Sequence, residues 1–164
     1  MSREVALTRE EREARARVEG LGIDIDAFAA VSNVFRVANA VRNYMERNLL
    51  AEYRLSFSGF TVLWVLWVWG PRESHALAEE SGISKSTLTG VVKTLEGLGF
   101  AARRPHAADG RRVLVEATDK GLAAVREIFP RFNALEGKIT RDLSTEEKEE
   151  LARALRIMLH TVEA

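Results

Sequence analysis

The chain has 164 residues, of which 46% are apolar, and its 24 Lys and Arg residues balance 24 Asp and Glu residues. This length suits one domain, or one domain with an oligomerisation element, and allows a sizeable core. A zero net charge argues against a protein that coats nucleic acid indiscriminately, although it leaves room for a local basic patch. Because the chain contains no cysteine, disulfides, thiol sensing and cysteine-ligated zinc are excluded.

The N-terminal segment is charged and begins with a capping-box pattern, Thr8 with Glu11. The pattern predicts a helix that ends near Gly20 and Gly22. A charged start is unlike a signal peptide, and the most apolar run, Phe60–Gly70, is too short to cross a bilayer. We therefore expect a soluble, cytoplasmic protein with no membrane partner.

Two further helices follow the extension. Asp24 or Asp26 can cap a helix that runs to about residue 52, with apolar residues at helical spacing from Phe28 to Leu49. Ser56 or Ser58 begins a third helix, FTVLWVLWVW, which is apolar on nearly every face. We expect this helix to be buried all round and to stop at Gly70-Pro71.

Residues 74–98 have the pattern of a helix-turn-helix. A short helix over 74–81 contains Ala78, a small residue where two helices must touch, and Gly82 follows where the chain must turn with positive φ. The second helix, over 85–98, has Leu88 and Val91 at the spacing that packs it on the first. This order of small and aliphatic residues is typical of a tight helix-turn-helix.

A basic hairpin, or wing, is predicted next. Residues 100–104 and 112–117 have the pattern of strands, with alternating residue types or β-branched residues. The turn sequence Ala108-Asp109-Gly110 lies between them. Residues 84–112 hold six basic residues against two acidic ones, whereas residues 142–150 are rich in Asp and Glu. One basic and one acidic pole are expected of a site-specific DNA-binding protein.

The last two helices complete a predicted dimerisation base. Thr118 caps a helix that runs to about residue 142 and bends at Pro130, and a final helix, begun by Ser144, carries apolar residues from Leu151 to Val162. A compact winged helix leaves these apolar faces without partners, as it does those of residues 28–49, so we expect a homodimer. The predicted fold is mainly α with a small β-hairpin: an extension (1–22), a helical dimerisation region from both chain ends (23–55 and 119–164), and a winged helix-turn-helix (56–118).

This order of elements resembles the MarR family of bacterial transcriptional regulators over about residues 26–162. Asp109-Gly110-Arg111 with Thr118-Asp119-Lys120-Gly121 matches the family's Asp-x-Arg wing motif and its T-x-K-G entry into the next helix. Residues 83–89 resemble the start of the family's recognition helix. Ala117 departs from the family pattern, which commonly has Leu there, and removes some packing at the wing base.

The resemblance implies sequence-specific binding to double-stranded DNA. On the second helix we expect Leu88, Val91, Val92 and Leu95 to face the core and the intervening residues to face DNA. Arg111 is expected in the minor groove, with Asp109 holding its guanidinium. The candidate DNA-binding residues are Ser84, Lys85, Ser86, Thr87, Thr89, Gly90, Lys93, Arg103, Arg104, Asp109, Arg111 and Arg112. The alternatives are an ordinary capped amphipathic helix and a solvated hairpin tip with an exposed ion pair.

Other kinds of site have weaker support. Trp64 and Trp67 are candidate ligand-binding residues, since family members often bind aromatic acids between the dimer base and the DNA-binding head; the alternative is that the tryptophans only pack this junction. His75, His106 and His160 are scattered, so no metal site is predicted. No catalytic constellation or phosphate-binding loop is evident, so we expect neither an enzyme nor a cofactor.

Two interpretations follow. In the first, the chain is a dimeric regulator, usually a repressor by resemblance, which binds a pseudo-palindromic site and is released by a small-molecule effector. In the second, it is a winged-helix module that binds proteins, or binds DNA without sensing a ligand. Lys85 and Arg111 on one surface favour the first, because a pure interaction module has no need of that basic pole.

Overall fold

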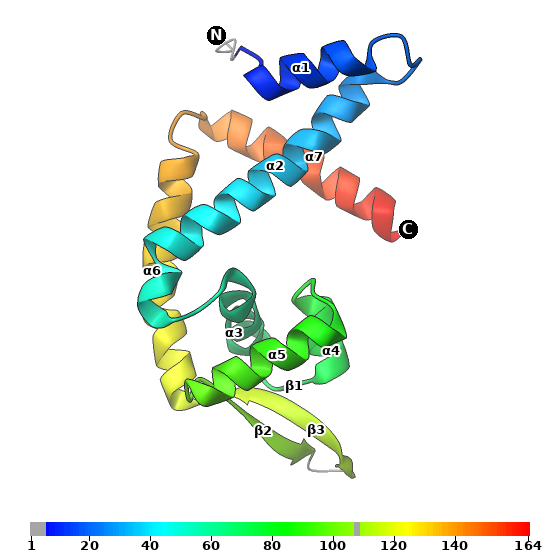
Figure 1. Ribbon diagram of the computed structural model, residues 1–164. Helices are drawn as coiled ribbons and strands as arrows, with labels where there is room; N and C mark the ends of the chain where they lie inside the picture. Colours follow the sequence, from blue (N-terminus) through cyan, green and yellow to red (C-terminus); the bar gives the residue numbers. More distant parts are fainter. Residues whose placement is uncertain (1–5, 107–108) are drawn as a thin grey trace. The chain divides into compact units, whose positions relative to one another are not determined.

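The computed structural model describes residues 6–106 and 109–164, and the side chains of these residues except 106 and 109–112 (Figure 1). The chain divides into two compact units, residues 1–43 and 44–164. The described part is mainly helical, with one small antiparallel sheet, as predicted. None of its helices has the length and apolar character needed to cross a membrane.

The first unit contains α1 (Arg9–Val18) and most of α2 (Ile25–Asn48). The Thr8 hydroxyl accepts the Glu11 N–H while the Glu11 carboxylate accepts the Thr8 N–H, which confirms the capping box. Asp24 caps α2 by accepting the N–H groups of Asp26 and Ala27 at 3.0 and 2.9 Å. The Asn33 side chain donates to Glu11 at 2.7 Å, so a hydrogen bond joins the two helices.

The second helix ends earlier than the sequence pattern predicts. It stops at Asn48 because Leu49 has φ −147°, outside the helical region, and a 3₁₀ turn, η1 (Leu50–Tyr53), takes over. Arg131 of α6 (Asp119–Ile139) donates to both Glu52 and Tyr53, and the Tyr53 hydroxyl donates to Glu127 at 2.6 Å. The hydrogen bond to the Glu127 carboxylate raises the pKa of Tyr53. Side chains of α6 thus hold the turn in place.

Helix α3 (Phe57–Trp69) forms the centre of the second unit. Ser56 caps it through the Gly59 N–H, and Gly70, at φ 75°, ends it. The prediction that this helix is buried all round was wrong for its last turn, since Trp67, Val68 and Trp69 are 36–50% exposed. Apolar character on every face cannot distinguish packing within the chain from packing against another molecule.

The helix-turn-helix consists of α4 (Ser74–Glu80) and α5 (Lys85–Gly97), close to the predicted bounds. Gly82 turns the chain at φ 63°, and the Ile83 N–H donates to the Ala78 carbonyl across the turn. Ala78 is only 4% exposed, as its small side chain and its position between helices require. The core of the second unit is made largely of Met45, Leu49, Leu50, Leu63, Leu77, Leu95, Val115, Val125 and Ile128.

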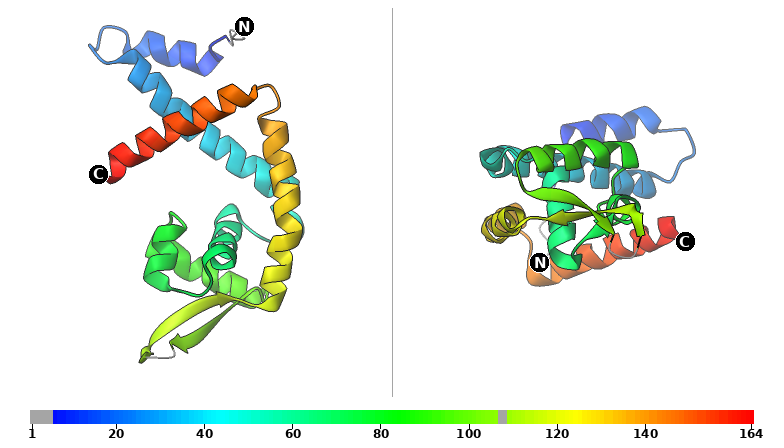
Figure 2. Two further views of the ribbon diagram at one scale, coloured as in Figure 1. Left: turned by 180° about the vertical axis from the view of Figure 1, so that it is seen from behind. Right: turned by 90° about the horizontal axis from the view of Figure 1, so that it is seen from below.

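The wing is a three-stranded sheet rather than the predicted two-stranded hairpin. Strand β3 (Asp109–Ala117) pairs antiparallel with β2 (Ala101–His106) on one side and with the short β1 (Arg72–Glu73) on the other. Two charged residues carry no alternating pattern, which explains why the sequence did not predict β1. The β2–β3 hairpin projects beyond the helix-turn-helix (Figures 1 and 2).

Helix α6 begins at a tight junction with the wing. Thr118 caps it through the Gly121 N–H, and the Thr118 hydroxyl also donates to the Gly99 carbonyl at 2.7 Å. The Lys120 ammonium donates to the Leu98 carbonyl at 2.7 Å, at the end of α5. These contacts give a physical reason for the Thr-x-Lys-Gly motif: it fastens α6 to the end of α5 and the base of the wing.

The last helices extend from this junction. Helix α6 continues through Pro130 to Ile139, three residues short of the predicted end, and α7 (Thr145–Glu163) begins with a capping box between Ser144 and Glu147. None of the residues of α7 is buried. Its exposed large apolar side chains are Leu151, Leu155, Ile157, Leu159 and Val162.

Candidate nucleic-acid interface

The exposed face of α5 carries the first set of candidate contacts. Leu88, Val92 and Leu95 are buried and Val91 is half-buried, as predicted. The seven residues expected to face outward are all exposed: Lys85, Ser86, Thr87, Thr89, Gly90, Lys93 and Thr94. The helix therefore presents small, hydroxyl and cationic side chains along one face and packs its aliphatic side chains on the other.

A cluster of hydroxyl groups lies at the N-terminus of α5. The Ser84 Oγ accepts the Thr87 N–H at 3.1 Å and lies 2.9 Å from the Ser86 Oγ and 2.8 Å from the Thr87 Oγ1. These hydrogen bonds order the three side chains at the end of the helix, where the helix dipole favours an anion. Hydroxyl groups can both donate to phosphate oxygens and contact base edges.

The middle of α5 is suited to close approach. Thr89 and Thr94 direct their hydroxyls back to the Lys85 and Gly90 carbonyls of their own helix, at 3.0 and 3.1 Å. A Cβ built on Gly90 would meet no atom within 4 Å, so packing within the chain does not explain the glycine. Because glycine has no side chain, the helix backbone between Thr87 and Thr94 is open to close approach by another molecule.

The described arginines of the wing are paired with acidic side chains. The Arg103 guanidinium donates to the Glu96 carboxylate on α5, and that of Arg104 donates to Glu116 on β3. All four side chains are partly exposed. Glu96 and Glu116 could not be predicted as partners from the sequence, because these pairs form only when β2 folds beside α5 and β3.

The wing tip holds the other three candidate residues. Asp109, Arg111 and Arg112 lie on strand β3, but their side chains fall outside the described residues. Their proposed contacts to DNA, and the pairing of Asp109 with Arg111, therefore remain predictions. Asp109 pairs with His106, at the opposite end of the hairpin from the pair Ala101 and Ala117, so the three residues lie toward the tip of the projecting β2–β3 hairpin (Figure 1).

Trp64 and Trp67 belong to an aromatic cluster with Phe129 of α6, a residue the sequence analysis did not single out. The rings of Trp64 and Phe129 stack with centroids 4.5 Å apart, and Trp67 lies 5.2 Å from Trp64. Trp64 is half-buried and Trp67 is 36% exposed. The cluster thus packs α3 against α6 and also presents an aromatic surface.

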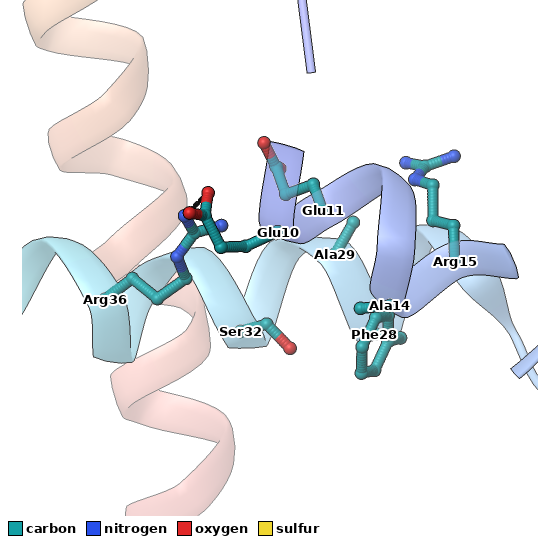
Figure 3. Close-up of a pocket in the computed structure, with 8 residues that line it drawn as sticks. All are labelled: Glu10, Glu11, Ala14, Arg15, Phe28, Ala29, Ser32 and Arg36. Atoms are coloured by element: carbon teal, nitrogen blue, oxygen red, sulfur yellow. Dashed lines mark hydrogen bonds and ion pairs between the residues drawn. The ribbon is translucent and has the colours of Figure 1, made fainter. Parts of the chain in front are cut away.

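The first unit has a cavity of its own, of about 180 Å³, between α1 and α2 (Figure 3). Ala14 of α1 and Phe28 of α2 both line it, and Arg36 pairs with Glu10 at 3.4 Å (Figure 3). Sites for drug-sized ligands are usually larger, about 300–1,000 Å³, so we interpret this cavity as a packing gap. Among the described residues, no group of three or more His, Asp or Glu side chains is placed to hold a metal ion.

Comparison with known proteins gives a consistent result. Residues 55–113 match the model of the MarR family. Over 161 residues, 94% of each chain, the sequence is 34% identical to YwaE of Bacillus subtilis, named an uncharacterised HTH-type transcriptional regulator. It is 27% identical over 138 residues to YetL of the same organism, named an HTH-type transcriptional repressor, and this match covers 81% of this chain and 80% of that one.

Solved structures agree with the fold. The structure of BpsR from Bordetella bronchiseptica, described as regulated in its DNA binding by 6-hydroxynicotinic acid, superimposes with a TM-score of 0.70 at 25% identity. The match covers 79% of this chain and 98% of BpsR.

Proposed function

The chain belongs to the MarR family, and we propose that it acts as a homodimeric repressor that leaves its DNA site when a small aromatic ligand binds. It is a DNA-binding transcriptional regulator and not an enzyme. The observation that carries the proposal is the exposed face of α5. Ordered hydroxyl groups, two lysines and Gly90 lie on this face, and the opposite face of the helix packs against the core.

We assign base contacts to the N-terminal half of that face and phosphate contacts to its lysines. Ser86 and Thr87 lie where a recognition helix approaches base edges, whereas Lys85 and Lys93 supply charge. The wing adds Arg111 in the adjacent minor groove. Ser84, Thr89, Gly90, Asp109 and Arg112 complete the proposed surface.

Arg103 and Arg104 can join this DNA-binding surface only if they release their present partners. Each is already paired with a carboxylate, Glu96 or Glu116, so it can bind phosphate only by exchanging that partner. Since exposed ion pairs contribute only about 0–1 kcal/mol, a DNA phosphate can compete for the guanidinium. We therefore propose that both arginines contact phosphates less strongly than the lysines of α5.

Uncovered apolar side chains support a homodimer. Those on α7 run from Leu151 to Val162, and in the first unit Val31, Phe35 and Val37 are 45–66% exposed. A two-fold dimer with two α5 helices would bind a pseudo-palindromic site whose half-sites lie about one helical turn apart.

The aromatic cluster of Trp64, Trp67 and Phe129 is our candidate ligand site, with an aromatic acid as the ligand class. Trp67 offers an exposed ring beside two stacked ones, and the DNA binding of the relative BpsR is described as regulated by 6-hydroxynicotinic acid. The alternative, that the tryptophans only pack α3 on α6, is supported by the contacts that both rings make with Phe129 of α6, at 4.5 and 6.2 Å between ring centroids.

A mobility-shift assay tests the proposal. The DNA upstream of the chain's own gene should be retarded by the full-length protein, and added 6-hydroxynicotinic acid should release it. A Trp67→Ala variant should bind the same DNA and fail to respond. If the protein binds the DNA but no aromatic acid changes that binding, the chain is a regulator without this ligand site. If it does not bind the DNA, a protein-interaction module is favoured.

A further inference from the structure

An open groove of about 410 Å³ lies between the first turn of α3 and the exposed face of α5. Arg54 and Ser56 line one wall, and Thr87, Gly90 and Thr94 line the other. The walls are close together, since a Cβ built on Gly59 of α3 would lie 3.9 Å from a methyl carbon of Leu95. The groove therefore runs along the same face of α5 that we propose to contact DNA.

Arg54 has an unusual backbone conformation. Its φ of 58° and ψ of 30° are left-handed, and every other described residue with positive φ is a glycine. The turn needs this conformation because it brings the Leu55 N–H to the Leu50 carbonyl at 3.0 Å, beside the bond from the Arg54 N–H to the Ala51 carbonyl. Glycine adopts the left-handed conformation without the steric conflict of a Cβ. An arginine at this position therefore suggests a use for its side chain.

The guanidinium is available for such a use. Arg54 is exposed, and within the described part of the chain no hydrogen bond or ion pair involves its side chain. The carboxylates nearby in sequence have other partners: Glu52 accepts from Arg131 at 2.7 Å, and Glu46 accepts the Phe57 N–H at 2.7 Å.

Two of the first three amides of α3 already have partners. The Phe57 N–H donates to the Glu46 carboxylate and the Gly59 N–H donates to the Ser56 hydroxyl. Among the described residues that line the groove, Arg54 alone is charged. Its guanidinium is therefore the strongest group for an anion there, and it can hold two phosphate oxygens with parallel N–H groups.

We infer that Arg54 binds a phosphate of the DNA strand that borders the major groove occupied by α5. The inference rests on the proposed role of α5, because a helix inserted in the major groove has phosphates along both of its flanks. Arg54 would thus bind the DNA backbone from outside both the helix-turn-helix and the wing, and would fix the position of α5 without selecting a base.

The test compares four variants on a duplex that contains the parent protein's footprint, by fluorescence anisotropy at several salt concentrations. Arg54→Ala should weaken binding about tenfold or more and make the slope of log K against log[salt] shallower by about 0.9 for each phosphate that is no longer neutralised. Arg54→Lys should keep the parent's salt slope, because the charge remains, and should lose less affinity than Arg54→Ala, because only the two-pronged contact to phosphate is lost. Arg17→Ala, which removes the same charge from α1, should bind like the parent.

Arg54→Gly separates the side chain from the backbone. It should lose as much affinity as Arg54→Ala while its melting temperature equals or exceeds that of the parent, because glycine suits the left-handed turn. Parent-like affinity of Arg54→Gly, or an unchanged salt slope of Arg54→Ala, would overturn the inference and leave the proposed function standing. A parent protein that binds no duplex would overturn both.

Discussion

The junction between the wing and α6 leaves no space for a side chain at position 121. A Cβ built on Gly121 would lie 2.0 Å from the Phe100 carbonyl oxygen and 2.9 Å from its carbonyl carbon. Real Cβ atoms essentially never come within 3.0 Å of a heavy atom from a residue that is distant in the chain. The obstacle is backbone, and the same Phe100 oxygen accepts the Thr118 N–H at 3.0 Å. To admit a methyl group, the strand must move by about 1 Å and weaken that hydrogen bond.

We therefore expect Gly121→Ala to destabilise the fold. Overpacking at the upper end of its usual range costs about 3 kcal/mol, and a weakened hydrogen bond adds about 1 kcal/mol. For a chain of this size, about 3–4 kcal/mol corresponds to a fall of roughly 6–16 °C in melting temperature. Calorimetry or circular dichroism would measure the shift.

Gly137→Ala is the matched control in the same helix. A Cβ at Gly137 meets no atom within 4 Å, so alanine should stabilise the helix by up to about 1 kcal/mol, since glycine is a poor helix former. The two substitutions should therefore shift the melting temperature in opposite directions. A Gly121→Ala chain that melts at or above the parent's temperature would refute the description of this junction.

Three further predictions concern assembly, DNA and pH. Deletion of residues 150–164 should give a monomeric or aggregated chain in sedimentation, whereas a stable folded monomer of the full chain at micromolar concentration would contradict the proposed dimer. Arg111→Ala should remain folded and weaken DNA binding about tenfold or more per head, measured by mobility shift, because the variant cannot donate charged hydrogen bonds to the DNA; unchanged affinity would exclude the wing tip from the interface. Hydrogen bonds from Asn33 and Thr8 lower the pKa of Glu11 below its usual 4.5, so its contribution to holding α1 is present above pH 4.5 and disappears as pH falls through the lower folded value. The protection of α1 amides from hydrogen exchange, relative to their intrinsic rate at each pH, should fall at that acid step, and Asn33→Leu should reduce the fall; protection in α1 that stays constant through the step would refute it.

The helix-turn-helix was predictable because local residues determine it. The spacing of Leu88, Val92 and Leu95 fixes which face of α5 is buried, and Gly82 fixes the turn. Caps at Thr8, Ser84 and Thr118 follow from their own hydroxyls. The orientation of the seven exposed residues of α5 required no knowledge of the tertiary structure.

Features that depend on distant partners were not predictable. The pairing of Arg103 with Glu96 requires β2 to fold back beside α5, and β1 exists only because β3 offers it an edge. The exposed ring of Trp67 shows the same limit, since apolar composition does not reveal which molecule covers a side chain. The role of Arg54 could not be predicted for a different reason. Its left-handed backbone is visible only in the structure, and glycine is the residue expected in that conformation.

The salt dependence of DNA binding tests most directly the claim that the exposed face of α5 contacts DNA. The comparison is between the parent chain and Lys85→Ala/Lys93→Ala on the duplex upstream of its own gene, with Lys138→Ala/Lys148→Ala removing equal charge from α6 and α7 as the control. Our account predicts a weaker complex and a slope of log K against log[salt] shallower by about 0.9 for each phosphate left without its lysine, with no change in the control. Equal affinity and equal slope for the parent and the Lys85→Ala/Lys93→Ala chain would contradict it.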